Sequence, residues 1–276
     1  MRLSSSLLSL AAAGSFVAAH TRFECGTEPD PEYQALAAKV TQSDPTTWNG
    51  GIEYEVKTYI HVVAASQSVE DGNISDKMIQ DQFDVLNKAY APHGFKFNHV
   101  NTSRTINPTW ANGEQEMEMK GALRTGTYAD LNVYFLKQFK PILYANCPFP
   151  SNYRRGLPMY IRDGCMIPAA SVPGGSAPDY NLGITTVHEV GHFMGIYHTF
   201  QGRCSSTRGD DIADTPAQLN GSEGCPEGRD SCPDEPGLDP IHNFMDTSTD
   251  ACRYEFTPLQ GAAMRDMYKE WRYGKP

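Results

Sequence analysis

The spacing of apolar residues predicts alternating strands and helices over roughly the first 199 residues. β-Branched and aromatic residues dominate 54–63, and shorter apolar runs at 95–100 and 131–136 indicate two further strands. Between the first two strands a helix is expected to start after Ser75 and to stop at His93 and Gly94. Its apolar positions are Ile79, Phe83, Leu86 and Tyr90.

Weaker helical patterns lie at 33–40 and 117–123, and a final helix starts at Thr257 with Pro258 and Gln260 in its first turn. Strands alternating with helices predict an α/β (α+β) fold. Residues 200–255 are different, because they are dense in Gly, Pro, Ser, Asp and Cys and carry little periodicity. We expect an irregular segment there, held by disulfides.

The first 19 residues have the layout of a secretory signal peptide. Arg2 precedes an apolar run that ends in the small residues Ala18 and Ala19, and this run is too short and too interrupted to span a membrane. We therefore expect a signal peptide over 1–19, a polar leader over 20–48 and one catalytic domain over 49–276. The mature protein is expected to be secreted and extracellular.

Charge and cysteine content narrow the possible partners. A formal net charge of −10 argues against nucleic acid, and no later stretch is long and apolar enough for a membrane partner. Cysteines normally pair in an oxidising compartment, but this chain has seven, so at least one has no partner within the chain.

The string T-T-V-H-E-V-G-H-F-M-G-I-Y-H-T-F at 185–200 carries the candidate chemistry. His188 and His192 are four residues apart, so they share one face of a helix and can bind one zinc ion. Gly195 lets the chain turn back, which brings His198 in as a third ligand. Three protein ligands leave one position open to water, which is typical of a catalytic zinc.

Glu189 follows the first ligand and is predicted to be the general base. It would take a proton from the zinc-bound water and pass it to the leaving amine. A chance H-E-x-x-H string on a solvated helix is the alternative, but the added glycine and third histidine at fixed offsets argue against it. We expect a monomeric zinc endopeptidase that acts on protein or peptide substrates.

The longer string H-E-x-x-H-x-x-G-x-x-H resembles the metzincin signature, and Met245 in N-F-M-D at 243–246 resembles the metzincin Met-turn. Among metzincins the chain looks most like the pappalysins, namely the fungal secreted metalloproteases and their ulilysin-like relatives. The resemblance also rests on A-D-T-P at 213–216 and on four cysteines late in the chain. The resemblance implies a two-lobed protease, with a mixed sheet and the active-site helix in the upper lobe. The lower lobe would be irregular and disulfide-held, with a C-terminal helix.

The same resemblance implies disulfides Cys204–Cys232 and Cys225–Cys252, although four cysteines alone allow three connectivities. Cys147 and Cys165 would remain as a third pair.

Two departures from the family matter. Relatives often have a tyrosine two residues after the Met-turn methionine, where this chain has Thr247, and losing such a donor typically costs a few kcal/mol of transition-state stabilisation. Relatives that cut before arginine have an acid just before the last cysteine, where this chain has Ala251, with Asp250 one step earlier. Arginine preference is therefore open.

The stretch R-F-E-C-G-T at 22–27 resembles, loosely, the Arg-x-Cys-Gly-Thr leader motif of some pappalysins. A thiolate is a soft zinc ligand, so Cys25 would block the open zinc position until the leader is cut away. The alternatives are a free thiol or a disulfide from Cys25 to Cys147 or Cys165.

Other candidate sites are weaker. Sequons at Asn73, Asn101 and Asn220 suit N-glycosylation in the same compartment. Some relatives bind calcium, and Asp210, Asp211 and Asp214 could do so here, although a solvated acidic loop explains them equally well.

Two other functions compete with the endopeptidase. A catalytically impaired, zinc-containing binding or adhesion module is favoured by Thr247 and opposed by Glu189. A zinc amidase of cell-wall material would use the same histidines.

Overall fold

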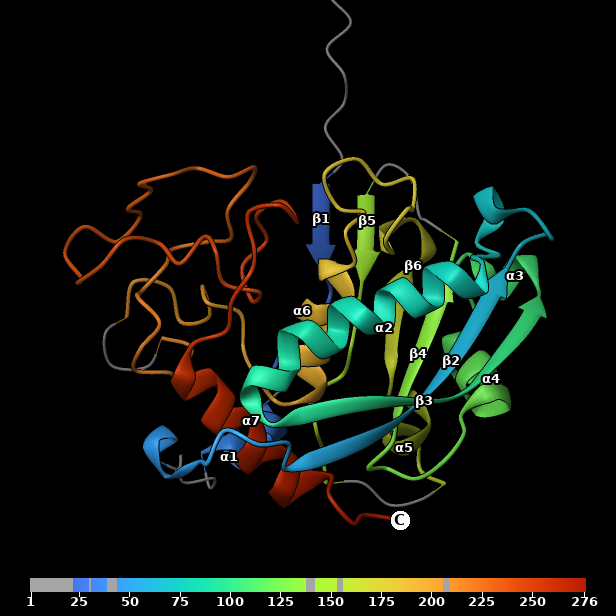
Figure 1. The fold of residues 1–276 in the computed structure, drawn as a ribbon, viewed down its shortest axis with the longest axis horizontal. Coiled ribbons are helices and arrows are strands. Elements are labelled where there is room, and N and C mark those ends of the chain that lie inside the picture. Colours follow the sequence, from blue (N-terminus) through green and yellow to red (C-terminus); the bar gives the residue numbers. More distant parts are fainter. Residues whose placement is uncertain (1–21, 30, 39–43, 138–141, 153–155, 206–208) are drawn as a thin grey trace, which may run out of the picture.

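A four-stranded parallel sheet forms the centre of the protein (Figure 1). The computed structural model describes residues 22–29, 31–38, 44–137, 142–152, 156–205 and 209–276. The strand order is β3-β2-β4-β6, with β2 longest among the inner strands. The strands are β2 (Tyr54–Ala64), β3 (Phe95–Ile106), β4 (Leu131–Leu136) and β6 (Cys165–Pro168).

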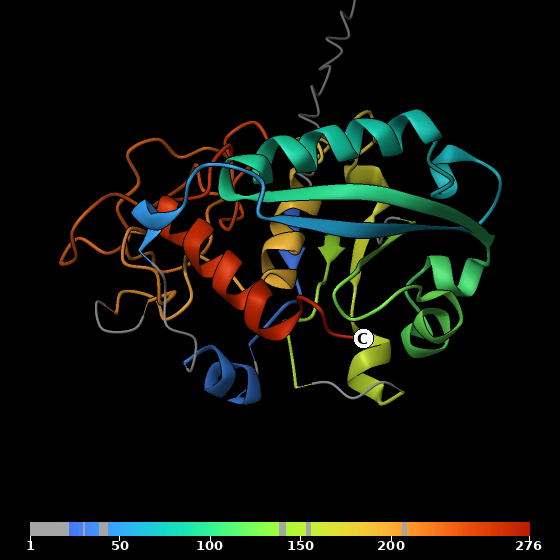
Figure 2. The ribbon, with the colours of Figure 1, turned by 60° about the horizontal axis from the view of Figure 1, so that its bottom comes forward.

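Helix α2 (Asp76–Tyr90) connects β2 to its parallel neighbour β3 and lies along one face of the sheet (Figure 2). Ser75 caps it, accepting a hydrogen bond from the amide of Met78 at 3.3 Å. The shorter helices lie on the other side or at the edge, and short 3-10 turns join several elements. The short helices are α3 (Pro108–Ala111), α4 (Glu116–Leu123) and α5 (Pro158–Arg162).

Two helices connect the sheet to the rest of the protein. Helix α6 (Ile184–Phe193) packs against β6 and α2, and the hydroxyl of Tyr90 in α2 donates to the carbonyl of Val187 in α6 at 2.8 Å. Helix α7 (Pro258–Trp271) begins with a capping box formed by Thr257 and Gln260. Both helices bury most of their residues, so they form the wall between the sheet and the irregular segment.

In the N-terminal segment, residues 22–29 and 31–38 belong to the folded structure. Strand β1 (Arg22–Cys25) pairs in parallel with β5 (Ile142–Ala145), and α1 (Pro31–Ala37) follows. The antiparallel part of the expected mixed sheet is the bridge from Asn146, after β5, to Met166 in β6. Strand β1 therefore joins the far edge of the molecule's strand system.

The described part of 200–255 contains no helix or strand, as its composition predicts, and lies to one side of the sheet (Figure 1). Three disulfides cross-link the chain, two of them within this segment. The pairs are Cys147–Cys165, Cys204–Cys232 and Cys225–Cys252. They are the pairs that the resemblance and the remaining cysteines suggested.

A buried arginine ties the end of α7 to the ends of α5 and α6. Arg272 follows α7, donates to both carboxylate oxygens of Asp163 at 2.9 and 3.3 Å, and donates from Nε to the carbonyl of Phe193 at 2.8 Å. The guanidinium thus satisfies a carbonyl at the C-terminal end of α6, where backbone acceptors lack helical partners.

The patterned elements appear close to where the sequence predicts them. Strand β3 is longer than the predicted 95–100, and β1, β5 and β6 were not predicted because each has only four residues. The expected signal peptide over 1–19 lies outside the described residues. No helix in the described part of the chain has the length and apolar character needed to cross a bilayer.

Arg272→Leu should lower the free energy of unfolding by about 3 kcal/mol, since the buried Asp163 carboxylate then keeps only one guanidinium partner, Arg124 at 3.2 Å. The side chains of Arg272 and Asp163 are 0% and 2% exposed. Urea unfolding would measure the change. The control is Lys77→Ala, which breaks a surface pair whose side chains are 81% and 36% exposed and should cost less than about 1 kcal/mol. Equal losses in the two variants would contradict the assignment.

Candidate active site

Helix α6 carries two of the candidate ligands and the candidate base on buried positions. His188, Glu189 and His192 are each 0% exposed. The helix ends at Phe193, and Gly195 then adopts a positive φ of 90°, which lets the amide of Ile196 donate back to the carbonyl of Gly191 at 2.9 Å. This reversal brings His198 back beside the helix.

The three imidazoles converge on one point. The ring nitrogens Nε2 of His192 and His198 are 3.2 Å apart, and the ligand atoms of His188, His192, His198 and Cys25 all lie within 4.8 Å of one another. The Nδ1 atoms of His188 and His192 face the carbonyls of Phe244 and Ile196, each at 2.8 Å. A proton on Nδ1 leaves Nε2 free as a metal ligand.

The donor set fits zinc. His188 Nε2 is buried and has no hydrogen-bond partner among the described residues, so its lone pair is available to a metal. Burial lowers the pKa of His188 and of His192 well below the usual value, and lowers that of His198 to about 3. All three rings are therefore neutral, which metal binding requires.

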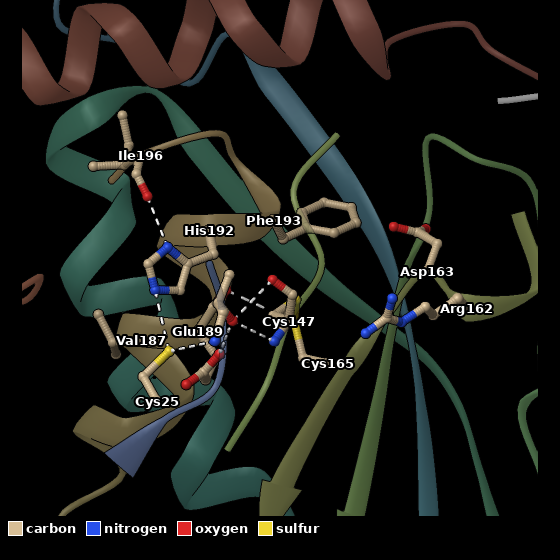
Figure 3. The surroundings of a disulfide bond; sticks show 12 residues. Cys25, Cys147, Arg162, Asp163, Cys165, Val187, Glu189, His192, Phe193 and Ile196 are labelled. Carbon is tan, nitrogen blue, oxygen red and sulfur yellow. Dashed lines mark hydrogen bonds between the residues drawn. A yellow bond between two sulfur atoms is a disulfide. The ribbon is translucent and has the colours of Figure 1, made fainter. Parts of the chain in front are cut away.

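Glu189 stands beside the histidines but turns its carboxylate toward the N-terminal segment (Figure 3). The hydroxyl of Thr27 donates to Oε2 at 3.3 Å, whereas Oε1 is buried with no partner among the described residues. Burial raises the pKa of Glu189 to about 8, and hydrogen bonds from Cys25 and Thr27 oppose the rise. A carboxylate in such surroundings readily accepts a proton.

Met245 lies directly under α6. Its side chain is 0% exposed, and a Cβ built on Gly191 would approach the Met245 sulfur to 2.4 Å, so only glycine permits this packing. The turn is fixed by Asn243, whose Oδ1 accepts from the amide of Met245 at 2.9 Å and whose amide donates to Gln260 at 2.8 Å. Met245 thus supports the helix from below.

Cys25 belongs to the histidine cluster, and Figure 3 shows its sulfur directed at His192. Its Sγ is 3.4 Å from Nε2 of His192, and it is not part of a disulfide. Burial, with the nearby Glu189 charge, raises the pKa of this thiol well above its usual value. Among the described residues this is the one cysteine that reaches the three histidines.

The backbone around Cys25 is held closely against β5. The amide of Gly26 donates to the carbonyl of Ala145 at 2.8 Å, and the hydroxyl of Thr27 accepts from the amide of Cys147 at 2.9 Å. A Cβ at Gly26 would come within 1.9 Å of the Tyr144 hydroxyl, so a side chain there would displace the Tyr144 ring. The disulfide Cys147–Cys165 lies next to this contact, with Cys165 Sγ 3.9 Å from the carbonyl of Glu189 (Figure 3).

Of the remaining predicted residues, Asn220 and Thr247 line the same pocket as His198 and Cys25. Asn101 and Asn220 are exposed, whereas Asn73 is half-buried and donates from its amide to the carbonyl of Gln67 at 3.0 Å. The hydroxyl of Thr247 donates to the carbonyl of Ser222 at 3.0 Å and is therefore engaged in the irregular segment.

Sequence reasoning missed Thr27 and Tyr180. Thr27 contacts Glu189, and the hydroxyl of Tyr180 donates to the carbonyl of Thr247 at 3.3 Å. No local spacing could have found either residue, because each reaches its partner through the tertiary fold.

Comparison with known proteins identifies relatives for nearly the whole chain. Residues 175–269 match the peptidase family described as pregnancy-associated plasma protein-A. An extracellular metalloprotease of Colletotrichum graminicola is 50% identical over 256 residues, which cover 91% of each chain. Extracellular metalloprotease 1 of Coccidioides posadasii is 50% identical over 280 residues, which cover 100% of each chain.

Solved structures share the fold. Mature mirolysin of Tannerella forsythia, in complex with a cleaved peptide, aligns with a TM-score of 0.65 and 24% identity, covering 82% of this chain and 97% of that one. Promirolysin of the same organism aligns with a TM-score of 0.67 and 22% identity, covering 90% and 96%.

Proposed function

The chain belongs to the pappalysin peptidases, the family described as pregnancy-associated plasma protein-A, and on that premise we propose a role for each residue of the three-histidine site. It is an extracellular zinc metalloendopeptidase of metzincin fold, and its substrates are peptides or proteins. The observation that carries the assignment of roles is the convergence of three neutral, buried imidazoles beside the Glu189 carboxylate.

His188, His192 and His198 hold the zinc through Nε2. The carbonyls of Phe244 and Ile196 fix the rings of His188 and His192, so two of the ligands are oriented before metal arrives. Zinc, when bound, supplies a Lewis acid that polarises the scissile carbonyl and makes water acidic enough to react at neutral pH.

Glu189 moves the proton. Its unpartnered Oε1 accepts a proton from the attacking water, and the protonated carboxyl then donates that proton to the leaving amine nitrogen. Burial disfavours the charged form of Glu189 and raises its pKa to about 8 in the present arrangement, so the ionised carboxylate is a stronger base than an exposed glutamate. A buried carboxylate oxygen such as Oε1, which has no partner among the described residues, is costly, and a binding module has no use for it.

The N-terminal segment keeps the site closed. Cys25 supplies the fourth zinc ligand, and Thr27 holds the carboxylate of Glu189. Together they occupy the position of water and restrain the base, so the chain is latent while residues 22–27 are in place. Removal of the leader, expected over 20–48, would then open the site.

Calcium binding is a separate proposal, and Asp210 is its candidate ligand. Asp210 is 4% exposed, its Oδ2 has no partner among the described residues, and burial raises its pKa to about 7. Asp214 instead accepts from the amide of Leu259 at 3.0 Å, at the start of α7, and Asp211 is exposed. We therefore propose Asp210, rather than all three aspartates, as the group that would bind calcium.

Glu189→Ala should abolish hydrolysis while zinc remains, because the base is lost and three imidazoles persist. The expected fall in kcat is on the order of 100- to 10,000-fold, with one zinc per chain by elemental analysis. Glu270→Ala, at an exposed position of α7, is the control and should leave both values unchanged. A Glu189→Ala enzyme that keeps more than a few per cent of the activity would refute the general-base role.

Cys25→Ala in the full precursor should release peptidase activity before any leader cleavage, since the fourth zinc position is then open. The unmodified precursor and Glu28→Ala, an exposed carboxylate in the same segment, should both stay latent. Peptidase assays must be accompanied by mass spectrometry that verifies an uncut leader. Equal latency of Cys25→Ala and the unmodified precursor would rule out the zinc-blocking role.

Calcium should raise the melting temperature of the unmodified chain but not that of Asp210→Asn, because ligand binding stabilises the folded state. The control is Asp81→Asn on the surface of α2, which should respond to calcium like the unmodified chain. A calcium response that survives Asp210→Asn would show that the ion binds elsewhere.

A further inference from the structure

The side chain of Phe23 fills a pocket next to the three-histidine site. Its ring stands edge-on to the imidazole of His188, with centroids 5.3 Å apart, and lies 6.0 Å from the ring of Tyr180. The guanidinium carbon of Arg253 lies 5.6 Å from the centroid of the Phe23 ring. Phe23 is only 3% exposed. We name this space, walled by Tyr180, His188 and Arg253, the Phe23 pocket.

The occupant of the pocket comes from the segment that blocks the site. Phe23 lies in β1 two residues before Cys25, whereas all three walls come from residues after 175. When the leader leaves, the walls stay and a buried apolar space opens beside a histidine that holds zinc. A substrate bound for cleavage must then place the side chain of a residue near the scissile bond there.

The two charged side chains beside the pocket, Arg253 and Asp250, already form an ion pair with each other. Arg253 donates from Nη2 to Oδ1 of Asp250 at 2.9 Å and from Nη1 to the carbonyl of Asp246 at 3.0 Å. The other oxygen of Asp250 accepts from the amide of Leu182 at 2.8 Å. Both charged side chains are 0% exposed. Asp250 therefore has both carboxylate oxygens engaged in hydrogen bonds within the protein.

The guanidinium of Arg253, unlike the carboxylate of Asp250, lies over the ring of Phe23. It contacts the Phe23 ring, and its Nε finds no hydrogen-bond partner among the described residues. An aromatic ring in this place gains a cation–π contact with Arg253 and ring contacts with Tyr180 and His188. A substrate arginine or lysine would instead bring a second buried cation against Arg253, while Asp250 is already held by that guanidinium and by the Leu182 amide.

We propose that the Phe23 pocket selects an aromatic side chain, and rejects arginine and lysine, at a residue that flanks the scissile bond. Tyr180 and Arg253 are the specificity-determining residues. The inference rests on the proposed function of the three-histidine site, and it settles the question that Ala251 raised: Asp250 does not replace the missing acid, because Arg253 and the Leu182 amide already hold it.

The test uses the full chain, secreted and activated by leader removal, with peptides that differ only at one residue flanking the cleaved bond. We expect kcat/KM for phenylalanine to exceed that for arginine by at least roughly 10-fold, in line with discrimination by an apolar pocket. A proteome-derived peptide mixture, analysed by mass spectrometry, should show the same enrichment of aromatic residues. An arginine peptide cut as fast as the phenylalanine peptide would overturn the proposal.

Tyr180→Ala assigns the preference to this pocket. It should raise KM for the phenylalanine peptide by roughly 10-fold, since one ring wall is lost, while the alanine peptide changes less than about threefold. Tyr254→Ala is the matched control, because that tyrosine is 61% exposed and stacks on His242. A preference that is unchanged in Tyr180→Ala, or lost equally in Tyr254→Ala, would overturn the assignment of the pocket.

The experiments distinguish failure of the pocket inference from failure of the proposed endopeptidase function. Cleavage that a chelator stops, but that shows no aromatic preference, defeats the pocket inference and leaves the zinc endopeptidase intact. Absence of any cleavage by the zinc-loaded, leader-free enzyme defeats the proposed function, and the pocket inference with it.

Discussion

Three buried imidazole rings converge on one point inside the protein. The neighbouring structure must keep these rings neutral and directed at that point. Backbone carbonyls of Phe244 and Ile196 orient two of the rings. Helix α6, which carries these two rings, is fixed by Tyr90 on one side and by Arg272 at its end. Small shifts in any of these contacts would separate the Nε2 atoms, so the packing of the whole domain bears on one cluster.

The N-terminal segment is held beside the three histidines both by its main chain and by its side chains. Strand β1 adds to the edge of β5 through main-chain hydrogen bonds, while Phe23, Cys25 and Thr27 direct side chains at a pocket, a metal site and a base. Main-chain pairing gives affinity that depends little on sequence, and the side chains give specificity. The segment therefore resembles a bound peptide in how it is held, although it is part of the chain.

How far the sequence predicts this structure depends on how local the determining contacts are. The helices at Ser75 and Thr257 have caps and apolar faces within a few residues, and the histidines lie within one short string, so both could be predicted. Strand β1 could not, because its four residues, of which Cys25 is the last, carry no periodicity and acquire their conformation from β5. The walls of the Phe23 pocket are equally invisible, since Tyr180, His188 and Arg253 meet only after the irregular segment folds.

The contact between Arg272 and α6 also orders events during synthesis. Arg272 follows Phe193 by 79 residues, so at ordinary rates of translation it is added roughly 4–16 s after the histidine helix has been made. Until Met245 is made, α6 lacks the side chain that packs beneath it. Until Arg272 is made, the carbonyl of Phe193 lacks its donor. Residues 22–27, in contrast, are made first. If residues 22–27 block the site as we propose, the emerging chain holds its blocking segment before it holds a competent site, and a ribosome-bound chain has no opportunity to digest its neighbours.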